Sequence, residues 1–227
     1  MACNFTFAHY GEILRKALDE GYAFHTFSGL LDARPQGRVM VLRHDVDSHL
    51  QRAAEFSRIE ASLGVKATYF IRAHTAYNPF EYNNFKVLAG IMAAGHEVGL
   101  HAEMGDFAKF NPGATPEEYL SRAKKFLEAC IGVPVKGVSP HRDLDYQVNS
   151  LPILEAMDFR ALGFNYHSYE DVFVKECKYV SETLSPHISW REGCPCGLLG
   201  KFGRICLMTH PRWWFHSHPR EGEFAWP

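Results

Sequence analysis

The chain has 227 residues, enough for one large domain or two small ones with a buried core. Hydrophobic residues make up 46% and charged residues 22%, which is typical of a globular protein and not of a disordered or fibrous one. Lys plus Arg is 24 and Asp plus Glu is 26, and this lack of a basic excess argues against a nucleic-acid or anionic-membrane binder. Histidine, at 13, is the unusual count, because imidazole ligates metals and titrates near neutral pH.

Neither membrane insertion nor secretion is indicated. No run of about 18 apolar residues is present, so we expect no transmembrane helix. The first residues lack the basic and apolar parts of a signal peptide, and the cysteines are scattered, which favours reduced thiols in a cytoplasmic protein. A structural zinc on Cys177, Cys194, Cys196 and Cys206 is the weaker alternative, because one residue separates Cys194 from Cys196 where zinc knuckles have two.

Strand-like and helix-like patterns alternate along the chain. Short apolar or β-branched runs predict strands, and apolar residues three or four apart predict helices. The clearest helix start combines a Thr115 cap, Pro116 at the first position and Glu118 as the partner of a capping box. In chain order the expected elements are a strand at 39–42, a helix at 53–63, a strand at 67–71, a helix at 85–92, a strand at 97–100, a helix at 116–132, strands at 135–138 and 160–164 on either side of a helix at 151–157, and a strand at 205–208.

This alternation predicts an α/β fold with right-handed parallel crossovers, as a barrel or as a doubly wound sheet. Both architectures bind ligands at the carboxyl ends of their strands. No glycine-rich phosphate loop follows a strand, so we expect no nucleotide site of that kind. Because the sequence has no internal repeat and no flexible linker, we expect a single domain over 1–227.

Polar residues of catalytic type follow four of the expected strands, at 43–47, 101–103, 139–143 and 209–214. Since the carboxyl ends of parallel strands meet at one edge of a sheet, we expect these residues to share one site. Asp45 and Asp47 are only two residues apart, and two carboxylates this close favour a nearby cation. One can ligate a metal while the other acts as a base; the alternative is a helix cap at Asp47 and a solvated Asp45.

Three further strand ends supply candidate ligands and an acid. His101, Glu103 and His141 are side chains that zinc, nickel or cobalt would accept. His210 suits a general acid. His44, beside the two aspartates, is a further candidate, whereas His96 lies at the start of its strand and is expected to be structural.

Trp213 and Trp214 follow His210 directly. Their flat apolar faces suit stacking on a sugar ring, so both are candidate substrate-binding residues. The alternative for one of the two is packing in the core or at its rim.

These strand ends resemble the motifs of the polysaccharide deacetylase family, carbohydrate esterase family 4. The resemblance runs from about residue 39 to residue 214, in the order of the family. The matching segments are Arg-His-Asp-Val-Asp at 43–47, Gly-His-Glu-Val-Gly-Leu-His at 95–101, Val-Ser-Pro-His-Arg at 138–142 and Leu-Met-Thr-His-Pro at 207–211.

The resemblance implies a distorted (β/α) barrel of about seven strands and a metal-dependent hydrolase. It implies Asp45 as the base, Asp47 and His101 as metal ligands and His210 as the catalytic histidine. The second motif of the family has another histidine four residues after the first, where this sequence has Gly105. The third ligand must then come from elsewhere; His141 is favoured because it replaces one imidazole by another, and Glu103 is the alternate ligand. Arg142 would orient the base or bind the substrate.

The expected reaction is removal of an N-acetyl group from a sugar or sugar precursor in the biosynthesis of a cell-surface glycan. The expected cofactor is a divalent metal, zinc before nickel or cobalt. One alternative, motivated by Gly105, is a catalytically impaired relative that only binds carbohydrate. The other is a metal-dependent hydrolase of a different C–N bond, such as a cyclic amide.

Overall fold

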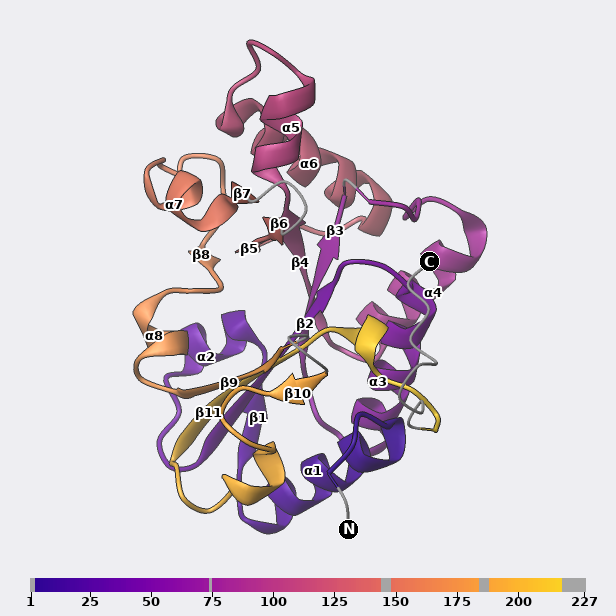
Figure 1. Cartoon of the computed structure of the whole chain (residues 1–227), viewed down its shortest axis with the longest axis vertical. Helices are drawn as coiled ribbons and strands as arrows, with labels where there is room; N and C mark the ends of the chain where they lie inside the picture. The colour runs from indigo at the N-terminus through magenta and orange to yellow at the C-terminus, as the bar shows by residue number, and fades with distance from the viewer. Residues whose placement is uncertain (1–2, 74, 144–147, 184–187, 218–227) are drawn as a thin grey trace.

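A curled sheet runs through the centre of the computed structural model, which describes residues 3–73, 75–143, 148–183 and 188–217 (Figure 1). The sheet has nine strands, all pairing in parallel except for one antiparallel pair, β10 with β9. In spatial order they are β10 (Ser189–Trp190), β9 (Lys178–Thr183), β11 (Arg204–Thr209), β2 (Val39–Val46), β3 (Thr68–Arg72), β4 (Glu97–Ala102), β5 (Gly137–Pro140) and β8 (Tyr166–His167), with β1 (Ala23–His25) beside the start of β2.

Helices lie on both sides of this sheet. In Figure 1, α1, α3 and α4 lie on one side of it, and α2 and α8 lie on the other. Their bounds are α1 (Phe7–Asp19), α2 (Phe27–Ala33), α3 (Leu50–Ser62), α4 (Tyr82–Ala93), α5 (Met104–Phe110), α6 (Pro116–Ile131), α7 (Ser150–Glu155) and α8 (Asp171–Val174). The remaining elements are the pair β6 (Arg142–Asp143) and β7 (Val148–Asn149) and the 3-10 turns η1 (Pro195–Gly197) and η2 (Pro211–Trp213).

The central strand β2 divides the core into two parts. Every residue of this strand is buried. Met40 and Leu42 belong to the larger core, whereas Val39 and Val41 belong to a smaller one with Phe70 of β3. Because successive side chains of a strand point to opposite faces, the residues that follow Val41 by even numbers stay on the side of the smaller core. Arg43 and Asp45 therefore lie on the side of the smaller core, and His44 lies on the side of the larger one.

Most of the expected elements are present. The helix start at Thr115 is confirmed, since Thr115 and Glu118 form a complete capping box. The strand expected at 160–164 is wrong: these residues form turns, with Gly163 at a φ of 82°, and a two-residue strand, β8, follows instead. No helix within the described ranges is long and apolar enough to cross a membrane.

A buried carboxylate lies on the side of β2 that α3 covers. Glu60 of α3 has no exposed surface and accepts hydrogen bonds from the hydroxyls of Tyr10 and Tyr69, each at 2.5 Å. His44 Nε2 lies 2.6 Å from the same carboxylate, and His96 Nε2 lies 3.6 Å from it. His44 is thus not held with the two aspartates, as the sequence suggested, because strand alternation turns it to the opposite face. His96 is structural, as expected.

Candidate active site

Three expected metal ligands meet at the carboxyl ends of β2, β4 and β5. The ligand atoms of Asp47, His101 and His141 all lie within 4.8 Å of one another. The Nε2 atoms of His101 and His141 lie 3.3 Å and 3.5 Å from Asp47 Oδ1. Donor atoms held about 2.1 Å from a zinc ion in a tetrahedral arrangement would be roughly 3.4 Å apart, so these separations suit one ion.

The surroundings of the two imidazoles fix which nitrogen faces Asp47. Nδ1 of His101 donates a hydrogen bond to the Ser139 carbonyl at 2.9 Å, and Nδ1 of His141 contacts the carboxylate of Glu103. Metal-binding histidines are commonly oriented by such partners on the other nitrogen. Asp47 Oδ1 is buried and makes no hydrogen bond of acceptable geometry within the described part of the chain, which leaves that oxygen for a cation. The donor set therefore fits a divalent metal.

The charge of Asp47 is maintained by its neighbours. Burial raises the pKa of its carboxyl, but the close imidazole of His101 and the charges of His210 and His141 outweigh burial and hold the pKa far below its ordinary value. Asp47 is thus an anion at neutral pH, as a metal ligand must be.

Glu103, the alternate third ligand, lies behind His141 and does not reach Asp47 or His101. It is fully buried directly after β4, where its carboxylate contacts His141 and pairs with Arg72 at 2.6 Å. Glu103 is absent from the ligand cluster and instead orients one of its members. Of the two candidates, the structure brings His141 to Asp47 and His101.

Gly105 occupies a position of α5 where no side chain fits. A Cβ atom built on Gly105 would overlap the side chain of Val148 on β7. A histidine at this position, as in the family motif, would therefore require the β6–β7 pair to move away. His141, which directly precedes the same pair of strands, lies against Asp47 instead.

We expect Gly105→Ala to lower the free energy of unfolding by about 1–3 kcal/mol, because overpacking against Val148 outweighs the roughly 1 kcal/mol gain in helix propensity. Gly90→Ala in α4 is the matched control, because its Cβ would meet no atom within 4 Å. Urea unfolding of both variants tests this, and Val148→Gly, which removes every Val148 side-chain atom that the new Cβ would meet, should recover part of the lost stability when combined with Gly105→Ala. A Gly105→Ala variant as stable as Gly90→Ala would contradict the steric explanation.

The expected base, Asp45, is bound by an arginine from its own strand. Arg43 Nε donates to Asp45 Oδ1 at 2.9 Å and Nη2 donates to Oδ2 at 2.7 Å, with both side chains buried. Burial raises the pKa of Asp45, but Arg43 and His101 lower it more, so that the pKa is about 2. The base-orienting role considered for Arg142 is therefore filled by Arg43, because Arg142 lies exposed on β6. Binding of substrate by Arg142 stays a prediction.

The expected acid, His210, follows β11 and is held by a glutamate that the sequence analysis did not find. Glu182 of β9 accepts a hydrogen bond from the His210 backbone N–H at 2.6 Å and lies 3.1 Å from Nδ1. The nitrogen that remains free for proton transfer is thus Nε2. Burial lowers the pKa of His210, but Glu182, Asp47 and Asp45 raise it to a net value above normal.

The prediction that Trp214 binds the substrate is wrong. Its side chain is fully buried, and its indole N–H donates to Glu182. The extended backbone after η2 turns Trp214 into the larger core, where it packs on Phe5 and Phe56. Trp213 is half-buried with its ring 4.1 Å from that of His210, so it contacts the expected acid.

We expect Glu182→Gln to move the alkaline limb of the pH profile of kcat/KM to lower pH. A general acid works in its protonated form, so a raised pKa extends activity upward in pH, and removing the carboxylate charge lowers that pKa. The pH profile of the variant measures the shift, with the exposed Glu176→Gln, just before β9, as control. An unchanged alkaline limb in Glu182→Gln would count against His210 as the acid.

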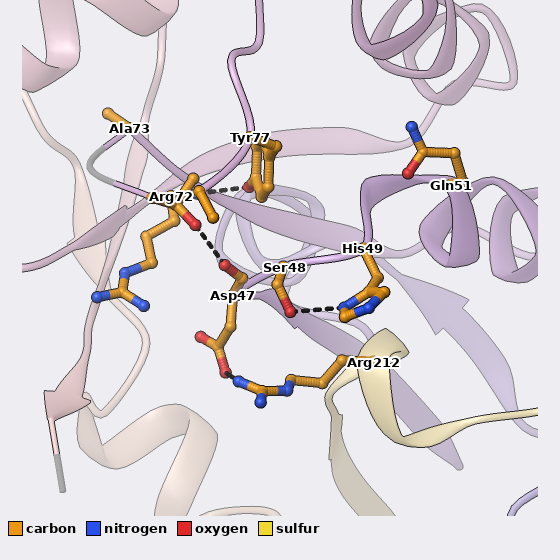
Figure 2. A pocket seen from close by; sticks show the side chains of 10 residues that line it. Asp47, Ser48, His49, Gln51, Arg72, Ala73, Tyr77 and Arg212 are labelled. Atoms are coloured by element: carbon orange, nitrogen blue, oxygen red, sulfur yellow. Dashed lines mark hydrogen bonds and ion pairs between the residues drawn. The ribbon is translucent and has the colours of Figure 1, made fainter. Parts of the chain in front are cut away.

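A groove of about 870 Å³ opens beside this cluster (Figure 2). It is lined by 47–49 and 51, by 72, 73 and 75–77, and by Arg212, so that it shares Asp47 with the ligand cluster. Figure 2 shows Asp47 directed toward Arg212, whose Nη1 lies 3.8 Å from Oδ2. The groove gives a ligand access to the carboxyl end of β2.

The curled parallel sheet is the α/β fold that the resemblance to polysaccharide deacetylases implies. No known family model and no curated protein sequence matches the chain. Among solved structures, the Streptococcus pyogenes deacetylase PplD in complex with acetate matches with a TM-score of 0.54 at 16% identity, over 93% of this chain and 87% of that one. The chain is a divergent protein of that fold, as the resemblance implied.

Two further structures match at lower scores. IcaB from Ammonifex degensii matches with a TM-score of 0.49 at 17% identity, over 70% of this chain and 73% of that one. BA3943, a CE4 family pseudoenzyme from Bacillus anthracis, matches with a TM-score of 0.46 at 14% identity, over 78% of this chain and 56% of that one. The shared fold rests on the match to PplD, and the chemistry has to be argued from the residues of the site.

Proposed function

We propose that this protein is a metal-dependent hydrolase that removes an N-acetyl group from a sugar or sugar precursor in glycan biosynthesis. The observation that carries the proposal is the cluster of Asp47, His101 and His141 with a charged carboxylate, Asp45, beside it. Asp45 Oδ2 lies 3.7 Å from His101 Nε2, so that the carboxylate borders the ligand cluster without belonging to it. This arrangement separates a base from the ligands, as hydrolysis of an amide requires.

The ligands Asp47, His101 and His141 would hold a divalent ion, of which zinc suits the nitrogen donors best. When bound, such an ion lowers the pKa of a water and polarises the acyl carbonyl. Asp45 accepts the proton of the attacking water on an oxygen whose orientation Arg43 fixes. His210 donates a proton from Nε2 to the departing amine, which is a poor leaving group without it. Glu182 keeps His210 protonated until that step.

The proposed substrate is an N-acetylated sugar in the groove beside Asp47, and we further propose that it is a precursor handled in the cytoplasm. The groove is open and lined by both polar and apolar side chains, as a pyranose ring with its hydroxyls would need. Its cationic side chains are already paired in part, Arg72 with Glu103 and Arg212 near Asp47, which favours a neutral sugar.

Release of acetate from N-acetylated sugars by the full chain tests the proposal, with and without added zinc, cobalt or nickel. We expect activity that a chelator removes and that the added metal restores, and none in His101→Ala. His25→Ala, which changes a half-buried histidine of β1 outside the cluster, should retain activity. Tight binding of sugar and metal without acetate release would overturn the hydrolase and favour the carbohydrate-binding alternative. Release of ammonia or ring opening of a cyclic amide would favour the other C–N hydrolase.

A further inference from the structure

A second group of metal-binding side chains lies between the N-terminal segment and the turn η1. It consists of Cys3, His9 of α1, Cys194 and Cys196, whose ligand atoms all lie within 4.8 Å of one another. The sequence offers Cys194 and Cys196 as zinc ligands together with Cys177 and Cys206. Cys177 and Cys206 lie instead in the smaller core, so that combination is wrong.

The four donor atoms converge on one point. Cys3 Sγ lies 3.3 Å from Cys196 Sγ, Cys196 Sγ lies 3.2 Å from Cys194 Sγ, and His9 Nε2 lies 3.2 Å from Cys194 Sγ. Sulfur atoms about 2.3 Å from a tetrahedral zinc would be roughly 3.8 Å apart, so a slight expansion of the cluster would seat an ion. A disulfide needs about 2.05 Å between two sulfurs and would leave the third thiol and the imidazole without a role.

His9 is oriented as a metal ligand is. Its side chain is 6% exposed, and Nδ1 lies 3.0 Å from the Glu12 carboxylate. A carboxylate on Nδ1 keeps the proton there and leaves the lone pair of Nε2 directed at the thiols. This outer partner is independent of the cysteines, and it reproduces the carboxylate–histidine–metal arrangement of known zinc sites.

The turn η1 positions two of the thiols, and a lysine side chain lies beside them. The 3-10 turn η1 begins at Pro195, and its backbone hydrogen bond from Gly197 N to Cys194 O brings the two flanking cysteines to one side. Lys16 Nζ donates to the Cys196 carbonyl at 2.8 Å, which ties α1 to the turn and places a cation near the thiolates.

We propose that Cys3, His9, Cys194 and Cys196 bind a structural zinc ion that joins the N-terminal segment to η1. Three thiolates and one imidazole are a complete tetrahedral set, with no position open for a substrate, so the site is structural and not catalytic. The ligands come from segments 185 to 193 residues apart in the sequence, and zinc would therefore stabilise the folded chain by closing a long loop.

Cobalt binding tests this site separately from the candidate active site. The starting protein is the full chain carrying His101→Ala and His141→Ala, purified with reductant, stripped with a chelator and reloaded with Co²⁺ or Zn²⁺ alone. We expect one metal per chain, an intense thiolate-to-cobalt charge-transfer absorption that oxygen and nitrogen ligands do not give, and a higher Tm with Zn²⁺.

Cys194→Ser and His9→Ala in the same background should lose the metal and the rise in Tm, whereas Cys130→Ser should keep both. Cys130 is the matched control because it is buried elsewhere, against Pro79. Cobalt bound without the charge-transfer absorption, or a disulfide found by mass spectrometry in the zinc-saturated protein, would overturn the proposal. Failure of acetate release has no bearing on this result, because the starting protein already lacks two ligands of the active site.

Discussion

Asp45→Asn lowers kcat for acetate release by about 10²–10⁴ while the metal content stays unchanged, which is the expected loss when a general base is removed. The amide is close in shape to the carboxylate but cannot accept the proton of the attacking water. Asp47, His101 and His141 are untouched, so the ligand cluster remains. The loss should therefore fall on kcat and leave KM nearly constant, because Asp45 is not among the residues that line the groove.

The same substitution affects Arg43, and the measurement must separate the two effects. Arg43 is fully buried and would keep only an amide oxygen as partner in place of two carboxylate oxygens. We expect a lower Tm in Asp45→Asn, so activity is compared well below the melting transition and per mole of bound metal. The exposed Asp32→Asn is the control for the change of charge. Full activity in Asp45→Asn would remove Asp45 from the mechanism.

Glu60→Ala lowers the free energy of unfolding by about 3–5 kcal/mol, since it breaks a buried charged network by removing one partner. The hydroxyls of Tyr10 and Tyr69 lose their acceptor, and His44 and His96 lose the charge that faces them. Burial raises the pKa of Glu60, but the charge and hydrogen bond of His44 lower it to below normal, so the removed group is a carboxylate at neutral pH.

Urea unfolding with equal m-values for variant and parent is the measurement. Glu55→Ala on the same helix is the control, because Glu55 pairs on the surface with Arg58, which is 69% exposed, and such pairs contribute little. We expect a change below about 1 kcal/mol for the control. A Glu60→Ala variant that is no less stable than the control would show that the network carries no net stability.

The local patterns of the sequence were sufficient for the main helices and for the parallel sheet. The capping box at Thr115 and the apolar run at 39–42 are signals within a few residues, and both predictions are confirmed. The turn at 160–164 resembles a strand in its apolar residues, but Phe164 is buried by packing and not by pairing with a neighbouring strand. Burial of that kind depends on the tertiary contacts.

The strand-end rule also found most of the candidate site from the sequence alone. It named Asp45, Asp47, His101, His141 and His210, because polar residues after parallel strands share one edge of the sheet. It could not find Glu182, which lies within β9 and not after it. It also could not decide between Trp213 and Trp214, which are adjacent in the chain, since the path of the backbone after η2 sends only the second into the core.

What the sequence determined by itself is therefore the set of candidate residues: which residue types follow which strands, and that Gly105 stands where the resemblance would place a histidine. What only the tertiary structure decided is which of these side chains meet. Val148 fills the space beside Gly105, and His141 stands where it can face Asp47. Cys3 and His9 reach Cys194 and Cys196 across almost the whole length of the chain. Contacts between distant segments depend on how the helices pack on the sheet, and no periodicity within one segment encodes them.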